Sequence, residues 1–424
     1  MASDPLPAAA AETLFRLISP RGKPALDSLD GPGWDAAVRC LSENRMAGWA
    51  YHRLKLLEPA AVPEPAMRAL YRAFRANQLV NLVLLEEAKR VLPTLAARGL
   101  SPVPMKGIAF LERLYPDLGG RKMGDLDLLV NPREVPQAVA VLEALGYRAP
   151  PPPYPEEGGV DLELIEGTVV CRIDLNWQFV RRVKGNVRRR VPAAVWEAGR
   201  VTRRIAGADV MVLAPEDELL GLANHIVMHD EMARLPNIVD AALLLDAQPV
   251  DWARLNAQAA LYGLERPLAV TLGLLADVLG MEVPGDARER WRSHRAALLR
   301  TPAGVFLDRG WVLEHRGVGG LTEAPRAGFL RNLARFWLRY TMMATLGDRV
   351  SFVLAQCAPT APSVRRIFRV RRPWAVRAIQ RLLGPPYLVA IAGMMLGVRL
   401  LGSVIRSRLD SLMGERTIGR GAAA

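Results

Sequence analysis

The sequence of 424 residues contains little cysteine: only Cys40, Cys171 and Cys357 occur. They lie far apart and form no CxxC pair, so the sequence supports neither a disulfide framework nor a structural zinc site. The first residues include Asp4 and lack a basic region followed by an apolar run, which argues against a secretory signal. We therefore expect a cytoplasmic protein.

Long hydrophobic runs are also scarce. The acid-free apolar run from Pro385 to Val398 spans 14 residues before Arg399 ends it. A membrane-spanning helix needs about 20 such residues, and the Pro385-Pro386 pair blocks extension of the run toward the N-terminus. A transmembrane helix is therefore disfavoured.

Acidic residues are absent between Asp348 and Asp410. The chain after Arg300 holds 19 arginines and 6 acidic residues, which accounts for the whole formal net charge of +13. Seven arginines form a basic cluster between Arg365 and Arg381. The favoured interpretation of residues 365–405 is a solvated arginine-rich face beside a buried core helix. The alternative is peripheral contact with anionic lipid at the inner face of the membrane, each arginine near the surface adding about 1 kcal/mol. Nucleic acid is neither supported nor excluded.

The remaining composition is that of a globular protein, with 50% hydrophobic and 23% charged residues. The length suggests two or three domains. We expect an α+β fold in which a small α/β domain with a mixed sheet lies between helical regions. The expected divisions are an N-terminal helical region (1–100), the α/β domain (101–213), a helical bundle (214–300) and an arginine-rich helical region (301–424).

Periodicity predicts the elements of these regions. In the N-terminal region, apolar residues recur at helical spacing, as at Leu79, Leu82 and Leu85. In the α/β domain, alternation around Glu166-Gly167 predicts a β-hairpin. The other expected elements are strands at 103–105 and 125–130, helices at about 107–115 and from Asn131-Pro132 to Ala144, and bundle helices at about 215–230, 236–247, 251–262 and 266–279.

Two carboxylates lie on the segment GDLDLLV. Side chains alternate faces along a strand, so Asp125 and Asp127 project together while Leu126 and Leu128 enter the core. Like charges so close are unfavourable unless a cation lies between them, and oxygen ligands suit a nucleotide-bound Mg²⁺. The alternative is an edge strand that turns both acids to solvent.

A third carboxylate occurs in the strand TVVCRIDLNWQF. Asp174 is flanked there by the apolar Ile173 and Leu175. If this strand lies beside the Asp125 strand, the three carboxylates would converge. Such a site would hold one or two Mg²⁺ ions for phosphoryl or nucleotidyl transfer.

Donors for phosphate precede the acidic pair. Lys106 and Gly107 lie where a strand turns into a helix, so backbone amides at the helix start would face an anion and glycine would permit its close approach. Arg121, four residues before Asp125, would reach a phosphate or the acidic pair.

Together these motifs resemble the uncharacterised bacterial nucleotidyltransferase family of the DNA polymerase β-like superfamily, over about residues 70 to 280. The resemblance implies that Lys106-Gly107 is the phosphate turn, that Asp125 and Asp127 are the metal-binding pair, and that Asp174 is the third carboxylate. The sequence departs from the family pattern twice. The phosphate turn is usually Gly-Ser or Gly-Gly, and the usual DLHW reads Asp174-Leu175-Asn176-Trp177 here.

Three further polar residues lie in the helical bundle. His225 and His229 have the i, i+4 spacing of a zinc pair, but no glutamate lies between them as in HExxH, and both are equally explained as partly buried bundle residues. His225 would alternatively contact the nucleotide or the acceptor. Asp240, within an apolar helix, is either a partner of Arg234 or a site residue.

The leading hypothesis is a Mg²⁺-dependent enzyme that transfers NMP from an NTP to an acceptor hydroxyl and releases pyrophosphate. The alternative is a non-catalytic nucleotide-binding or polysaccharide-assembly protein on the same fold. No motif identifies the NTP or the acceptor.

Overall fold

A computed structural model describes residues 8–57, 62–152, 158–167, 169–180, 191–230, 232, 234–301, 303–304, 325–343 and 345–357. The basic cluster Arg365–Arg381 and the apolar run Pro385–Val398 lie outside these residues, so both interpretations of residues 365–405 remain predictions. Within the described ranges, none of the helices combines the length and apolarity that crossing a membrane requires.

A mixed four-stranded sheet forms the centre of the α/β region, in the order β1-β2-β4-β3. Its strands are β1 (Val103–Met105), β2 (Leu126–Leu129), β3 (Gly159–Glu166) and β4 (Val169–Asn176). β2 runs antiparallel to β1 and parallel to β4, and β3 pairs antiparallel with β4. The expected hairpin and the expected neighbourhood of the two acid-bearing strands are therefore confirmed.

Short elements complete this region. α5 (Lys106–Leu114) follows β1 directly and contacts β1 and β2. The expected helix start at Asn131-Pro132 is wrong: α6 (Val135–Ala144) begins three residues later, because Asn131 Oδ1 accepts the backbone N–H of Arg133 and closes a turn first. A two-stranded sheet of β5 (Val201–Ile205) and β6 (Ala208–Val212) follows α7 (Ala193–Ala198).

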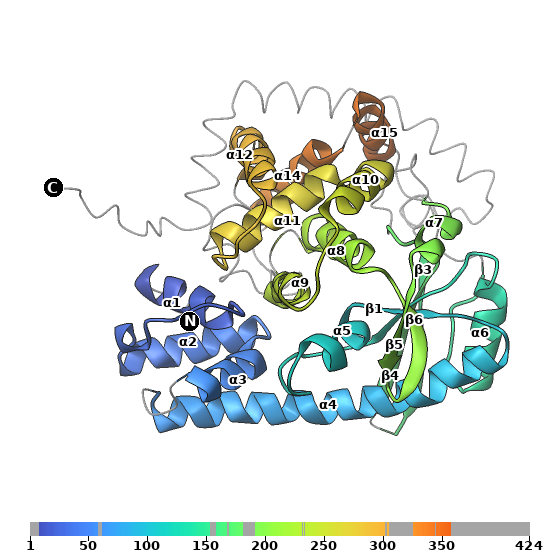
Figure 1. The fold of residues 1–424 in the computed structure, drawn as a ribbon, viewed down its shortest axis with the longest axis horizontal. Helices are drawn as coiled ribbons and strands as arrows, with labels where there is room; N and C mark the ends of the chain where they lie inside the picture. The colour runs from blue at the N-terminus through green and yellow to red at the C-terminus, as the bar shows by residue number, and fades with distance from the viewer. Residues whose placement is uncertain are drawn as a thin grey trace.

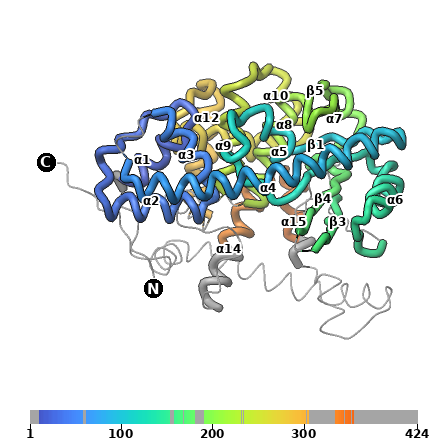
Figure 2. The backbone as a smooth tube through the Cα atoms, turned by 90° about the horizontal axis from the view of Figure 1, so that it is seen from below, coloured from blue at the N-terminus to red at the C-terminus, as the bar shows by residue number. Residues whose placement is uncertain are grey.

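The N-terminal region is helical. It contains α1 (Ala8–Ile18), the short 3₁₀ turn η1 (Leu26–Ser28), α2 (Gly31–Glu43), α3 (Ala47–Leu57) and the long α4 (Glu64–Ala97). α4 runs from this helical layer past α5 to α6 and supports both parts of the molecule (Figure 1). Seen from below, it crosses the face of the molecule as one continuous rod (Figure 2).

The buried face of α4 differs from the apolar face that the sequence predicted. Leu85 is buried, whereas Leu79 and Leu82 are 59% and 42% exposed. The helix instead turns Asn77 and Asn81 inward, because both amides bind a loop of the α/β region. The helical spacing was thus correct, but it did not mark the buried face.

The bundle after β6 packs against α5. It consists of α8 (Pro215–Asn224), the π-helical turn η3 (His225–His229), α9 (Leu235–Ala247), α10 (Trp252–Tyr262) and α11 (Glu265–Asp277). Three further helices pack beyond these: α12 (Gly285–Leu299), α14 (Pro325–Met342) and α15 (Leu346–Cys357) (Figure 1). α9 contacts α5, which fixes the bundle next to the strand-to-helix turn. The fold is therefore α+β, with a small mixed-sheet unit between helical regions.

Candidate functional site

A row of carboxylates crosses the sheet. Asp127 of β2 is the register partner of Asp174 of β4, and Asp174 is in turn opposite Asp161 of β3. Register partners project from the same face, so three acids from three strands lie along one line. Asp127 and Asp174 are buried, whereas Asp161 at the sheet edge is exposed.

Asp125 lies just before β2 and not on the strand itself. Its side chain is exposed at the surface of the site. The surrounding protein nevertheless desolvates the carboxyl group and raises its pKa, and the Asp127 carboxylate raises it further, while Lys106 and Arg121 oppose the change. An additional cation would stabilise the ionised form of this carboxyl group.

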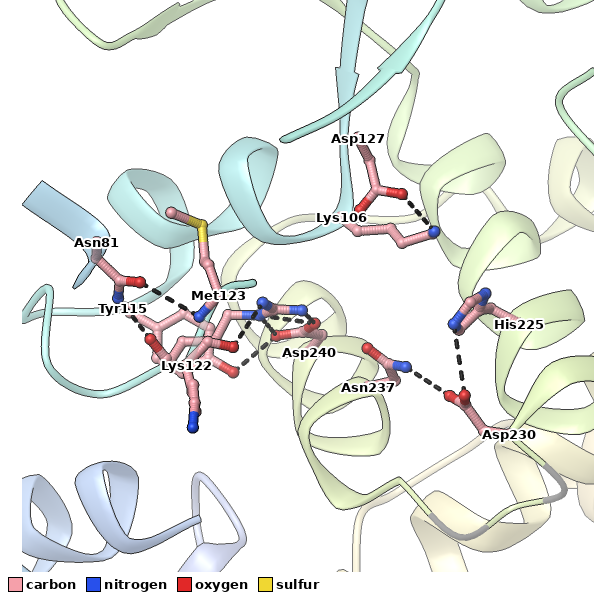
Figure 3. Close-up of polar contacts among 11 residues, drawn as sticks. Asn81, Lys106, Tyr115, Lys122, Met123, Asp127, His225, Asp230, Asn237 and Asp240 are labelled. Carbon is pink, nitrogen blue, oxygen red and sulfur yellow. Dashed lines mark hydrogen bonds and ion pairs between the residues drawn. The ribbon is translucent and has the colours of Figure 1, made fainter. Parts of the chain in front are cut away.

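Lys106 supplies a cation within the row. Its Nζ donates to Asp127 Oδ1 at 2.6 Å (Figure 3). Lys106 also has a φ of +49°, in the left-handed region that favours glycine, at the first residue of α5. Lys106 adopts this backbone conformation with a side chain that contacts an acid of the row.

Gly107 lies in a tight space behind the turn. A Cβ atom at this position would lie 2.8 Å from Arg121 Nη1 and 3.2 Å from the Met123 side chain. A larger residue would push the first turn of α5 away from the loop that leads into β2. The glycine therefore allows the helix start and the acidic segment to approach closely.

Arg121 is held mainly by the helical bundle. Its Nε and Nη2 donate to the Asp240 carboxylate of α9 at 2.7–3.0 Å, and Tyr115 donates its hydroxyl to Asp240 Oδ1 at 2.7 Å. Asp240 is thus the partner of Arg121 and not of Arg234. Burial raises the pKa of Tyr115 well above its usual range, and Asp240 adds to the effect. A phosphate contact by Arg121 stays a prediction, restricted to Nη1, which faces Gly107.

The loop before β2 is fixed from the other side by α4. Asn81 Nδ2 donates to the carbonyls of Leu118 and Arg121, both at 2.6 Å, and its Oδ1 accepts the Met123 backbone N–H at 3.2 Å (Figure 3). One buried amide therefore holds three points of the loop that carries Arg121 into position. This is the reason that α4 presents asparagine where leucine would be expected.

A pocket lies between the sheet and the helical bundle. Its walls include Met105 at the end of β1, Lys106 at the start of α5, Asn176 from β4, and Glu218, Gly221 and His225 from α8 and η3. Phe110, Phe179, Leu213, Leu222 and His229 are among its other lining residues. Lys106 contacts Asp127, and Asn176 shares the face of β4 with Asp174. The pocket therefore borders the acidic row.

The two bundle histidines do not form the zinc pair considered above. The rings of His225 and His229 are stacked, with centroids 5.2 Å apart and planes inclined by 17°. His225 Nε2 lies 3.5 Å from Asp230 Oδ1 (Figure 3). In the parts of the chain that the structure describes, no three His, Cys, Asp or Glu side chains are grouped to hold a metal ion.

Within the described residues, the acids of the row likewise form no group of three side chains placed to hold a metal ion. The strands are adjacent as expected, which pairs Asp127 with Asp174, while Asp125 lies just before β2 and Lys106 neutralises Asp127. A metal site formed by all three acids stays a prediction. The chemistry of the donor set still fits Mg²⁺, because all donors are carboxylate oxygens and the row already requires a cation. A metal ion would replace the lysine ammonium beside Asp127.

Sequence reasoning missed two features of the site. Asp161 was not singled out, although a two-residue hairpin loop after Glu166 fixes its register opposite Asp174. The contact between His225 and Asp230 was missed because an i, i+5 spacing suggests no contact on an α-helix. The π-helical turn that creates it has no signal in this sequence.

No match is found among curated proteins. The crystal structure of an antigenic nucleotidyltransferase-like protein from Paracoccidioides brasiliensis matches with a TM-score of 0.29 and 15% identity, over 49% of this chain and 94% of that chain. The family model for uncharacterised nucleotidyltransferases matches residues 30–280, starting earlier than the region expected from the motifs. This match covers more than half of the sequence, and the chain therefore belongs to the family of uncharacterised nucleotidyltransferases.

Proposed function

We propose that the protein is a Mg²⁺-dependent nucleotidyltransferase of the DNA polymerase β-like type, found in bacteria and acting in the cytoplasm. It would transfer NMP from an NTP to an acceptor hydroxyl and release pyrophosphate. The observation that carries the proposal is the register pairing of Asp127 with Asp174, next to the Lys106-Gly107 turn at the start of α5.

Asp125, Asp127 and Asp174 would hold the metal. When bound, Mg²⁺ would neutralise negative charge on the triphosphate and lower the pKa of the attacking hydroxyl. Asp127 lies on the central strand between the phosphate turn and Asp174. We therefore assign Asp125 and Asp127 to the nucleotide side of the site and Asp174 to the acceptor side.

Lys106 and Gly107 would bind the phosphates. The ammonium group of Lys106 neutralises Asp127 and would move to a phosphate oxygen when the nucleotide binds. The backbone N–H groups of the first turn of α5 would face the same phosphates, since a helix start stabilises negative charge. Gly107 keeps this turn close to the acids, and Arg121 Nη1 adds positive charge behind it.

In the transfer step, the acceptor oxygen forms a bond to the α-phosphorus. The bond between the α-phosphorus and the bridging oxygen breaks, and pyrophosphate leaves with the electron pair. Lys106 and the helix-start amides would stabilise that leaving charge. Burial of Asp127 and Asp174 excludes water from the strand side of the reacting atoms.

Isothermal titration with ATP, GTP, CTP and UTP, each with and without Mg²⁺, tests the proposal. We expect at least one NTP to bind only with the metal ion, because the acidic row would otherwise repel the triphosphate. Equal binding after chelation would contradict the metal-dependent site. Metal-dependent binding without any pyrophosphate release would favour the non-catalytic nucleotide-binding alternative.

A further inference from the structure

We infer that His225 is a catalytic residue of this site: it accepts the proton of the attacking hydroxyl group, with its ring oriented by Asp230. The inference rests on the proposed function, because it assigns the proton-accepting group of that same transfer. It also assigns the pocket beside Lys106 to the hydroxyl-bearing end of the acceptor.

His225 is placed to reach an acceptor in the pocket. His225 lies on the bundle wall of the pocket, across from Lys106 and Asn176, which belong to the strand side. Lys106 contacts Asp127, and Asn176 follows Asp174 on the same face of β4. An acceptor that enters this pocket therefore lies between the imidazole and the acidic row.

The ring has a defined orientation. His225 Nε2 lies 3.5 Å from Asp230 Oδ1, and Asp230 is 3% exposed. A carboxylate only accepts hydrogen bonds, so it favours the tautomer that carries the proton on Nε2 and leaves Nδ1 basic. Figure 3 shows the second ring nitrogen turned away from Asp230.

Asp230 is itself fixed in place. Its Oδ2 accepts a hydrogen bond from Asn237 Nδ2 at 2.6 Å, and Arg234 Nε lies 3.3 Å from its Oδ1. These contacts fix the position of the carboxylate beside the imidazole. Asp230 is therefore a positioning residue, which acts through His225.

The backbone explains how the two residues meet. On an α-helix, residues i and i+5 point about 140° apart around the axis. The chain from His225 to His229 is a π-helical turn, and the Asp230 N–H donates to the His225 carbonyl oxygen, five residues earlier, at 2.9 Å. This turn brings Asp230 below the imidazole, and such π turns occur frequently at functional sites.

In the proposed step, His225 Nδ1 takes the proton from the acceptor O–H. The O–H electron pair forms the new bond to the α-phosphorus. The bond to the bridging oxygen breaks, and pyrophosphate leaves with that electron pair. The imidazolium then returns its proton to pyrophosphate or to solvent.

The first test measures pyrophosphate release from Mg·NTP, with molar glycerol as the hydroxyl probe and water as background. A proton acceptor contributes about 100-fold or more. We therefore expect His225→Ala to lose at least that much in kcat, to bind Mg·NTP like wild type, and to regain activity with added imidazole. His294→Ala, a histidine of α12 outside the pocket, is the matched control and should turn over normally.

The outcomes separate this inference from the proposed function. Wild-type turnover in His225→Ala, or a loss that imidazole does not restore in a variant that still binds Mg·NTP, would overturn the role of His225 alone. If wild-type protein releases no pyrophosphate from any NTP with either probe, the proposed function fails, and the inference fails with it.

A second measurement does not use the alanine variant and so remains decisive if that variant does not fold. The chain has five histidines, so ¹H–¹⁵N spectra of their rings can be assigned with His225→Gln. We expect the neutral Nε2–H tautomer at His225, and a mixture of tautomers in Asp230→Asn. An Nδ1–H tautomer in the wild-type protein would overturn the inference.

Discussion

Arg121 and Asp240 form a buried, bidentate ion pair that links the loop before β2 to α9. Arg121 Nη2 lies 2.7 Å from Asp240 Oδ2, and the two side chains are 8% and 0% exposed. The third guanidinium nitrogen, Nη1, lies behind Gly107 at the start of α5. The pair therefore connects the helical bundle to the phosphate turn.

Loss of one partner of this pair should destabilise the protein strongly. Asp240→Leu leaves Arg121 buried and uncompensated and removes the acceptor of Tyr115, so we expect a cost of about 3–5 kcal/mol in the free energy of unfolding. Urea denaturation measures this cost. The double variant Arg121→Met, Asp240→Leu should recover a large part of it, and a single-variant cost under about 1 kcal/mol would contradict the assignment.

Gly107→Ala should impair nucleotide binding. The added Cβ would lie 2.8 Å from Arg121 Nη1, so the helix start must move away from the acidic row. We expect at least about tenfold weaker binding of Mg·NTP by titration calorimetry, which corresponds to about 1.4 kcal/mol. Gly124→Ala is the matched control, since a Cβ there meets no atom within 4 Å. Equal binding by the two variants would show that the turn is not part of the site.

The acids of the row should have separable roles. Asp174→Asn should leave Mg·NTP binding within about threefold of wild type and abolish transfer, whereas Asp127→Asn should weaken both, because only the nucleotide side is assigned to Asp127. Binding and pyrophosphate release are measured on the same preparations. Asp209→Asn, an exposed acid on β6, serves as control. Normal turnover in Asp174→Asn would remove that residue from the mechanism.

Asp217 should make the stability of the protein depend on pH. Burial raises the pKa of Asp217, while the Tyr262 hydroxyl and Arg254 oppose the change. The folded state then binds more protons than the unfolded state between the ordinary carboxyl pKa and the raised value. Stability is lost as pH rises through that window, by about 1.4 kcal/mol for each pH unit that it spans.

Replacement of Asp217 tests this dependence. Asp217→Asn keeps the Oδ1 atom that accepts the Tyr262 hydroxyl at 2.8 Å, so the variant should be at least as stable as wild type at pH 7 and should lack the decline. Tyr262→Phe should lose about 1–3 kcal/mol, because Asp217 then stays buried without that donor. Urea midpoints at pH 4 to 8 measure both, and an unchanged pH slope in Asp217→Asn would contradict the assignment.

The sequence predicted the parts of the site that depend on local pattern. Strand alternation placed Asp127 and Asp174 opposite the apolar face, and the hairpin around Glu166-Gly167 supplied the strand that lies beside β2. The same hairpin loop would also have identified Asp161. These inferences succeed because side-chain direction on a strand and the register of a tight hairpin are set by neighbouring residues.

The remaining features depend on contacts between distant residues. Arg121 meets Asp240 across 119 positions, and Asn81 of α4 binds a loop 40 positions away. No periodicity in either segment identifies these partners. The contact of His225 with Asp230 is local, but it requires a π-helical turn whose sequence matches that of an ordinary amphipathic helix.

The central claim is that the protein moves the α-phosphoryl group of an NTP and not its γ-phosphoryl group. The most direct measurement incubates the protein with Mg²⁺, cell extract and each NTP, labelled with ³²P at either the α or the γ position. With wild-type protein, we expect the α label to appear in a new product and the γ label to appear only in pyrophosphate. With Asp127→Asn, we expect neither the labelled product nor labelled pyrophosphate. Transfer of the γ label to an acceptor, or binding of NTPs without transfer of any α label, would contradict the account.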